Sequence, residues 1–73
     1  MTYPITLMTV NLARELNEAA VKENFNIKVS ADSTIVDARS LLALFALIGK
    51  RVNLVVSDGA DPKSFVRFAK RFA

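Results

Sequence analysis

The sequence has neither cysteine nor histidine among its 73 residues. Without cysteine no disulfide can hold the fold together, so burial of the hydrophobic residues, 52% of the total, must stabilise it. Without either residue the chain cannot build the common zinc sites or the usual histidine-based acid–base and nucleophilic catalytic groups. The acidic residues are scattered, and the segment SDGADP (57–62) is too short for a calcium loop. We therefore expect a protein that is not an enzyme and uses no metal or cofactor.

Long apolar runs are also missing. No segment reaches the roughly 20 consecutive apolar residues that a membrane-spanning helix needs. The opening stretch, MTYPITLMTVNLAREL, lacks the basic start and the long apolar centre of a signal peptide. The absence of cysteine is in keeping with a reducing compartment. The expectation is a cytoplasmic protein without a membrane partner.

Positive charge exceeds negative charge only slightly, with ten Lys and Arg residues against seven Asp and Glu residues. A net charge of +3 is not the footprint of a dedicated nucleic-acid-binding protein, and the chain lacks the aromatic sheet face on which such domains stack bases. The sequence therefore does not favour a nucleic acid partner. Four basic residues near the C-terminus, named the basic stripe below, are interpreted as a solvated helix face, with weak attraction to phosphate or to an acidic partner as the alternative: Lys63, Arg67, Lys70 and Arg71.

Hydrophobic periodicity predicts four strands and three helices. Alternating apolar side chains indicate the strands, and apolar residues at i, i+3, i+4 and i+7 indicate the helices. The order βαββαβα is typical of an α+β domain in which helices cover one face of an antiparallel sheet. We expect one domain, residues 1–73, with the following elements in chain order: a strand over 3–9, a helix over 10–24, a hairpin of strands over 25–30 and 34–38, a helix over 41–48, a strand over 51–57 and a helix over 63–72.

The same periodicity assigns the residues that face the core. Thr9 or Asn11 is expected to cap the first helix and Asp61 the last one, where Pro62 suits the first helical position. The residues expected to point inward are Ile5 and Leu7 of the first strand; Leu12, Ala13, Leu16, Ala19 and Ala20 of the first helix; Phe25, Ile27 and Val29; Val52, Leu54 and Val56; and Phe65, Phe68, Ala69 and Phe72 of the last helix.

The predicted helix over 41–48 is apolar almost all round, which is unusual for a helix in so small a domain. Ser40 precedes it as the expected N-cap, and Gly49 follows it. Leu44 and Ile48 are expected to face the sheet. The other large side chains of this segment are Leu41, Leu42 and Phe45. Three interpretations of them stand side by side: core residues, a self-association surface, or a patch that binds a partner protein.

The element order and the segment VDARSLLALFAL (36–47) resemble HPr, the histidine-containing phosphocarrier family of the bacterial sugar phosphotransferase system. In that family a strand ends in a Lys-Ser or similar pair, and the serine begins an apolar helix. Arg39 and Ser40 stand at that place. The resemblance implies an open-faced β-sandwich, with a four-stranded antiparallel sheet and three helices on one face.

The phosphocarrier chemistry of that family does not carry over. HPr proteins hold phosphate on a histidine at the start of the first helix, inside a motif like Gly-Leu-His-Ala-Arg-Pro. This sequence has MTVNLAREL (8–16) there, so the glycine, the histidine and the proline are absent. A chain without an imidazole cannot hold the labile phosphoramidate, and phosphocarrier activity stands only as an alternative within the family.

A second chemistry of the family does carry over. In many HPr proteins the serine that opens the second helix is phosphorylated by HPr kinase/phosphorylase, and the product binds a transcription regulator in carbon catabolite regulation. Ser40 matches that serine, and the chain resembles the histidine-less regulatory members that keep it. The implied partners are this kinase, a transcription regulator or phosphotransferase components; the rival reading is a domain that dimerises through the 41–48 helix. The implied partner-binding residues, named the docking patch below, are Arg39, Leu41, Leu42 and Phe45.

Overall fold

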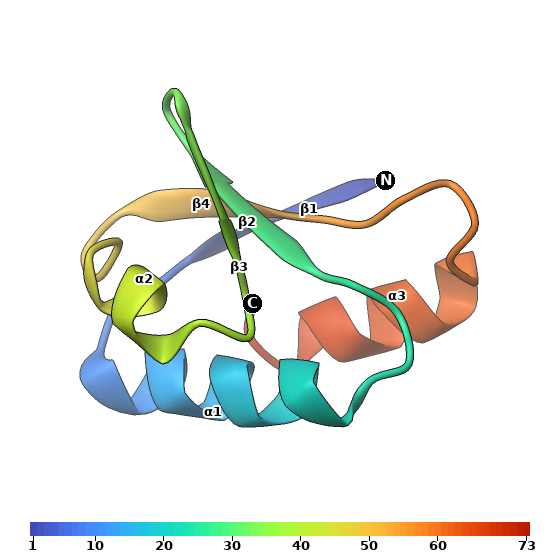
Figure 1. Cartoon of the computed structure of the whole chain (residues 1–73), viewed down its shortest axis with the longest axis horizontal. Helices are drawn as coiled ribbons and strands as arrows, with labels where there is room; N and C mark the ends of the chain where they lie inside the picture. Colours follow the sequence, from blue (N-terminus) through green and yellow to red (C-terminus); the bar gives the residue numbers. More distant parts are fainter.

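The computed structural model describes all of residues 1–73. All seven expected elements are present in the expected order. The three helices lie on one side of the sheet, and the other face of the sheet is open (Figure 1). The elements are β1 (Thr2–Thr6), α1 (Val10–Lys22), β2 (Lys28–Ala31), β3 (Thr34–Asp37), α2 (Leu41–Phe45), β4 (Arg51–Val55) and α3 (Pro62–Lys70).

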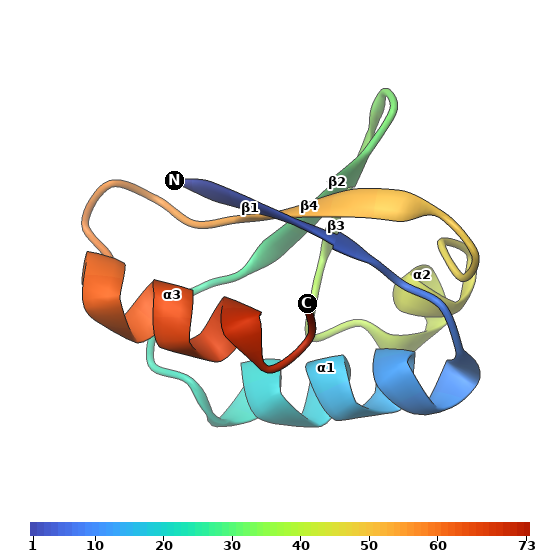
Figure 2. The ribbon, with the colours of Figure 1, turned by 180° about the vertical axis from the view of Figure 1, so that it is seen from behind.

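The four strands form one antiparallel sheet in the order β1-β4-β2-β3. β4 is therefore central, with the first strand on one side and the β2–β3 hairpin on the other. Ile5 pairs with Val52, and Val29 pairs with Leu54, so apolar residues of neighbouring strands share the inner face. Seen from behind, α3 lies beneath β1 and β4, beside the second half of α1 (Figure 2). The expected α+β open-faced sandwich is confirmed.

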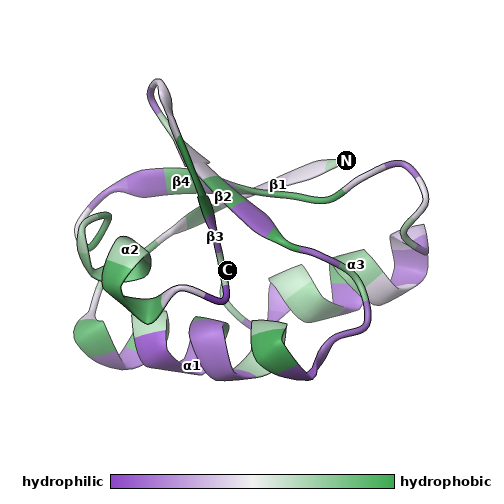
Figure 3. Cartoon of the chain, viewed as in Figure 1, coloured by the Kyte–Doolittle hydropathy of each residue, from purple (hydrophilic) through white to green (hydrophobic).

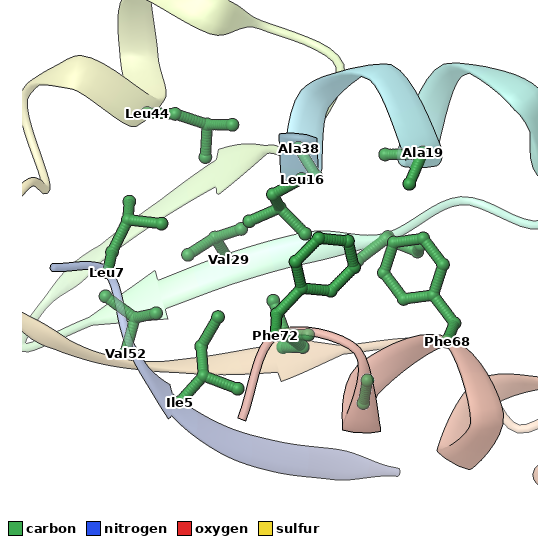
Figure 4. Packing of buried hydrophobic residues seen from close by; sticks show 14 of the residues in the cluster. Ile5, Leu7, Leu16, Ala19, Val29, Ala38, Leu44, Val52, Phe68 and Phe72 are labelled. Atoms are coloured by element: carbon green, nitrogen blue, oxygen red, sulfur yellow. The ribbon is translucent and has the colours of Figure 1, made fainter. Parts of the chain in front are cut away.

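The core consists of 20 buried residues, all of them hydrophobic, and contains no buried polar or charged residue. It fills the space between the sheet and the helices, where Leu16, Val29, Leu44 and Phe72 converge (Figure 4). The expected inward-facing residues are buried except for three. Leu12, Phe25 and Ile48 are only half-buried and pack against the margin of the core. The ring of Phe25 still packs edge to face against the ring of Phe68, with 6.3 Å between the two ring centres.

Side-chain caps begin the two longer helices as expected. Of the two candidates for α1 it is Thr9 that caps, because its Oγ1 accepts a hydrogen bond from the backbone N–H of Leu12 at 3.1 Å. Asp61 caps α3 by accepting from the backbone N–H and the hydroxyl of Ser64, at 3.2 and 2.7 Å. These bonds, the one from the hydroxyl first, hold the pKa of Asp61 below its usual value. Pro62 occupies the first turn of α3, as predicted.

Several predicted strands and helices are shorter in the structure than the sequence pattern indicated. The first strand ends at Thr6 rather than at residue 9, and the first helix ends at Lys22 rather than at 24. The second strand begins only at Lys28, since residues 25–27 lead into it. The β2–β3 connection is a two-residue turn in which Asp32 takes a positive φ of 54°. None of the three helices combines the length and the hydropathy that a membrane span requires.

The largest correction concerns the second helix. The helix predicted over 41–48 ends at Phe45, and a series of tight turns follows. The N–H groups of Leu47 and Lys50 donate to carbonyls only three residues back, at 2.9 and 3.1 Å. Gly49 has a φ of +88°, in the left-handed region that favours glycine, and its N–H donates to the carbonyl of Leu7 at 2.7 Å. After these turns the chain enters β4, whose first residue, Arg51, pairs with Thr6 of β1.

Candidate interaction site around the second helix

Ser40 lies in the short connection between β3 and α2, where it is exposed to solvent. Its Oγ accepts a hydrogen bond from the backbone N–H of Ala43 at 3.4 Å, and its carbonyl accepts from Leu44 at 3.1 Å. The backbone N–H of Ser40 donates to the carbonyl of Asp37 at 3.0 Å. Ser40 is the N-cap of α2, as predicted, but the cap bond is long. Its hydroxyl therefore stands at the positive end of a short helix and is accessible from outside.

The Asp37 carboxylate organises the turn before Ser40. It accepts a hydrogen bond from the backbone N–H of Arg39 at 2.9 Å. It also lies 3.5 Å from Lys28 Nζ and 3.9 Å from Arg39 Nε. The hydrogen bond from the Arg39 backbone N–H is the main cause that holds the pKa of Asp37 below its usual value. Burial, the second-largest effect, opposes it, and the nearby Lys28 and Arg39 charges lower the pKa again. Two cations are thus gathered within reach of the residues that precede α2.

Asn17 ties this turn to the first helix. Its side-chain Nδ2 donates to the carbonyl of Ala38 at 3.1 Å, and this bond is partly buried. Ala38 itself is buried, and its N–H donates to the carbonyl of Ile27 at 3.0 Å. The backbone on the N-terminal side of Ser40 is therefore anchored both to α1 and to the segment leading into β2. This anchoring fixes where the Ser40 hydroxyl and the start of α2 are placed.

The apolar run that begins at Leu41 is mostly used by the core. Leu44 and Leu47 are buried, and Phe45 and Ile48 are half-buried and pack against the core. Leu41 is half-buried as well. Leu42 alone is fully presented to solvent, with 81% of its surface exposed. The docking patch thus consists of one exposed leucine, two half-buried apolar side chains and the exposed Arg39.

Two exposed apolar residues outside the predicted docking patch lie at the same end of the molecule. Met8 and Val10 expose 69% and 46% of their surface at the start of α1. The N–H of Leu7 donates to the carbonyl of Lys50 at 3.0 Å, which joins this loop to the segment after α2. Apolar colouring accordingly covers both α2 and the first turn of α1 beneath it (Figure 3). Only the tertiary contact, not the sequence spacing, brings them together.

A second surface feature lies on the other side of α1. An open depression of about 320 Å³ runs between that helix and the end of α3. Its lining is mostly charged, and it includes none of the residues of the docking patch. The lining residues are Glu15, Glu18, Ala19, Lys22, Glu23 and Arg71. No group of three acidic side chains is placed so that it could hold a metal ion.

No protein-family model and no curated protein matches the sequence. Solved structures do match the fold along nearly its whole length. HPr-C-His from Thermoanaerobacter tengcongensis superposes with a TM-score of 0.76 at 20% identity, covering 97% of this chain and 88% of that one. The phosphocarrier protein HPr from Bacillus anthracis gives 0.76 at 12% identity, covering 100% and 96%. The histidine-containing phosphocarrier protein of Mycoplasma gives 0.75 at 18% identity, covering 99% and 90%. With its element order, strand order and three helices on one face, this chain has the fold of the HPr phosphocarrier proteins.

Proposed function

We propose that the chain is a non-catalytic regulatory or adaptor protein with the HPr fold, which binds protein partners through the docking patch and Ser40. One observation carries the proposal: a phosphocarrier fold is built from a sequence without any histidine. The exposed Ser40 at the start of α2 supports it as well. Without a histidine that could carry phosphate, the docking patch and Ser40 are the features of this chain that can take part in this function.

Phosphorylation of Ser40 would act locally. A phosphate adds about two negative charges at pH 7, and an N-cap position is one where a helix tolerates them. The phosphate would compete with Asp37 for Arg39, whose guanidinium lies 3.9 Å from that carboxylate. The charge would arise one and two residues before Leu41 and Leu42. It would therefore change which partner the docking patch accepts without unfolding α2.

The partners in this proposal are proteins of the cytoplasm. An HPr kinase/phosphorylase would modify Ser40, and a transcription regulator or a component of the phosphotransferase system would bind the modified or the unmodified form. An apolar side chain as exposed as Leu42 is suited to the centre of such a contact, because it removes apolar surface from water on binding.

The direct test separates this function from phosphate carriage. We expect no labelled protein after incubation with phosphoenolpyruvate and the upstream phosphotransferase enzyme, and labelling of Ser40 after incubation with ATP and an HPr kinase. Ser40→Ala is the control for the second reaction. An acid-labile phosphate acquired from phosphoenolpyruvate would overturn the proposal. It would also be overturned if the kinase failed to modify the wild-type chain and Ser40→Asp bound its partner as tightly as the wild type does.

Self-association is the second candidate, and the exposure of Leu42 favours it. In this case a second copy, rather than a different protein, would cover the end of the molecule that carries α2. Gel filtration over a wide range of protein concentrations distinguishes the two. An elution volume that shifts with concentration in the wild type and stays at the monomer position in Leu42→Ala would establish the dimer.

A further inference from the structure

The net positive charge of the protein is concentrated on α3 and the residues that flank it. Residues 61–73 contain four of the ten Lys and Arg residues and one of the seven acidic residues, a balance of +3. The six basic and six acidic residues of positions 1–60 cancel. The whole excess of +3 therefore lies on α3 and the residues that flank it. A modest charge for the chain as a whole becomes a strong one for this surface.

The cations of the basic stripe are free of ion pairs. The only two ion pairs in the molecule join Asp37 to Lys28 and to Arg39, far from α3 in the sequence. All four stripe residues are exposed, whereas Phe65 and Phe68 on the opposite side of the helix are buried in the core. Nothing in the chain neutralises the stripe by direct contact, so its charge is available to an external anion.

The structure divides the stripe into two parts. Lys63, Arg67 and Lys70 follow the spacing i, i+4, i+7 and form one row on the outer side of the helix. Arg71 points to the other side and lies 5.4 Å from the ring centre of Phe72. There it lines the depression together with Glu15, Glu18 and Lys22 of α1 and with Glu23, the C-cap of α1. The three glutamates outnumber the two cations that line this depression, so it would repel a polyanion, and the outer row is the part that can receive one.

We infer that the outer row of α3 binds the phosphate backbone of a nucleic acid without reading its sequence. The seven residue steps from Lys63 to Lys70 rise about 10 Å along the helix. One strand of a duplex places about three phosphates over that length, at ~3.4 Å each along the axis. Three cations in a row thus meet a comparable number of phosphates. Binding through phosphates alone does not require aromatic side chains on which bases can stack. The lack of an aromatic sheet face therefore argues only against recognition of bases.

The outer row of α3 is less suited to a protein partner or to a lipid bilayer than to a nucleic acid. Protein interfaces are centred on apolar or aromatic side chains, and charged residues are depleted there. A helix that lies on a lipid bilayer inserts an apolar face. The large hydrophobic side chains exposed on this protein are Met8, Val10, Val21, Ile35 and Leu42, and α3 carries none of them. A purely cationic row with no apolar centre matches a phosphate backbone better than either alternative.

The test measures the fluorescence anisotropy of a fluorescein-labelled duplex of twenty base pairs as the full chain is added, from low to physiological salt. We expect weak binding, and the logarithm of the binding constant should fall with the logarithm of the salt concentration at a slope of about −3, as three phosphate contacts to a duplex imply. The triple variant Lys63→Gln/Arg67→Gln/Lys70→Gln should lose affinity by more than about tenfold at the lowest salt. Its control, Arg14→Gln/Lys50→Gln/Arg51→Gln, removes the same charge from exposed residues elsewhere and should bind nearly as well as wild type.

Melting curves confirm that both triple variants are folded before affinities are compared. Equal losses in the two triple variants would overturn the inference, because overall charge rather than α3 would then govern binding. Absence of binding by the wild type at the lowest salt would overturn it as well. The same holds if vesicles rich in phosphatidylglycerol, or poly-glutamate, bind more tightly than the oligonucleotide. As a single-charge comparison, Arg67→Gln should weaken binding more than Arg71→Gln; equal effects would contradict the division of the stripe.

Discussion

The helices α2 and α3, at the two ends of the helical layer, differ in how their apolar residues are divided between the core and the surface. α3 is nine residues long, has an aromatic face in the core and presents a charged face to water. α2 has five residues, and Leu44 is the only one of them that is buried. The sequence of α2 is nevertheless much more apolar than that of α3. An apolar sequence does not by itself produce a well-buried helix; α3 is buried more completely because its apolar residues recur with the helical period.

This difference assigns unlike roles to the two ends. α3 and the turn that follows it stabilise the fold through Phe65, Phe68 and Phe72, and the long side chains that they expose are charged. The region around α2 uses part of its apolar surface for the core and leaves Leu42 outside. Substitutions in the two regions should therefore separate stability from binding, and the expected effects below run from the largest to the smallest.

Truncation of the aromatic face of α3 should have the largest effect. Phe68 contacts the rings of Phe25 and Phe72, at 6.3 and 5.2 Å between ring centres, and Phe65 is 1% exposed. Phe65→Ala and Phe68→Ala should each lower the free energy of unfolding by about 3–5 kcal/mol. That is much of the stability expected of a domain this small. Thermal and urea denaturation measure it, and melting within a degree or two of wild type would show that α3 does not anchor the core.

A pair of leucines on α2 sharpens the comparison within one helix. Leu44 is 0% exposed and Leu42 is 81% exposed. Leu44→Ala should cost about 2–5 kcal/mol of stability. Leu42→Ala should change stability by no more than about 0.5 kcal/mol and should weaken partner binding or self-association. Each variant needs a melting temperature and an affinity or a dimerisation constant. Similar destabilisation by both would mean that the exposed leucine is buried in solution and that no docking patch exists there.

Ser40 allows the cap and the proposed switch to be separated. Ser40→Ala removes the acceptor for the Ala43 N–H and should cost about 0.5–1 kcal/mol, the lower part of the range for an N-cap because the bond is 3.4 Å long. Ser40→Asp keeps a good N-cap and adds a charge, so its melting temperature should stay near that of wild type. A change in partner binding by Ser40→Asp at unchanged stability would support regulation at this residue. Partner binding that follows stability alone would limit Ser40 to a structural role.

The smallest effect is expected from Asp37. Its pKa is lower in the folded protein than the ordinary value of 3.8, first because of the hydrogen bond from the Arg39 N–H. The carboxylate therefore stabilises the fold at every pH above about 3.8, and this contribution is lost as the pH falls through the lower pKa of the folded state. Because the side chain is 39% exposed, its ion pairs should contribute no more than about 1 kcal/mol.

Asp37→Asn should accordingly be less stable than wild type at neutral pH, and the two should converge at acid pH. Urea denaturation between about pH 2.5 and pH 7 measures both proteins over this window. Asp58→Asn, which removes an exposed carboxylate outside any ion pair, is the matched control. A constant difference between Asp37→Asn and wild type across the whole range would show that the ionised carboxylate is not what stabilises the turn.

Local patterns were sufficient to predict the element order, the inward-facing residues and the caps. Alternation in β4 and the helical spacing of the phenylalanines of α3 are properties of short segments, and the structure confirms them. The end of α2 was mispredicted because it depends on a contact between Gly49 and Leu7, 42 positions apart in the chain. Met8 and Val10 were missed for the same reason, since tertiary contact alone places them beside the segment after α2. The site could be located from Ser40 and the apolar run, but not its extent.

The central position of β4 determines the order in which the sheet can be assembled. The β2–β3 hairpin is local and can form as soon as its residues are synthesised. β1 has no partner until β4 exists, because the register joins Thr6 to Arg51, 45 positions later. Closing so long a loop costs entropy that only the completed sheet recovers, which slows folding. On a translating ribosome, β1 therefore lacks its strand partner until residues 51–55 have left the exit tunnel.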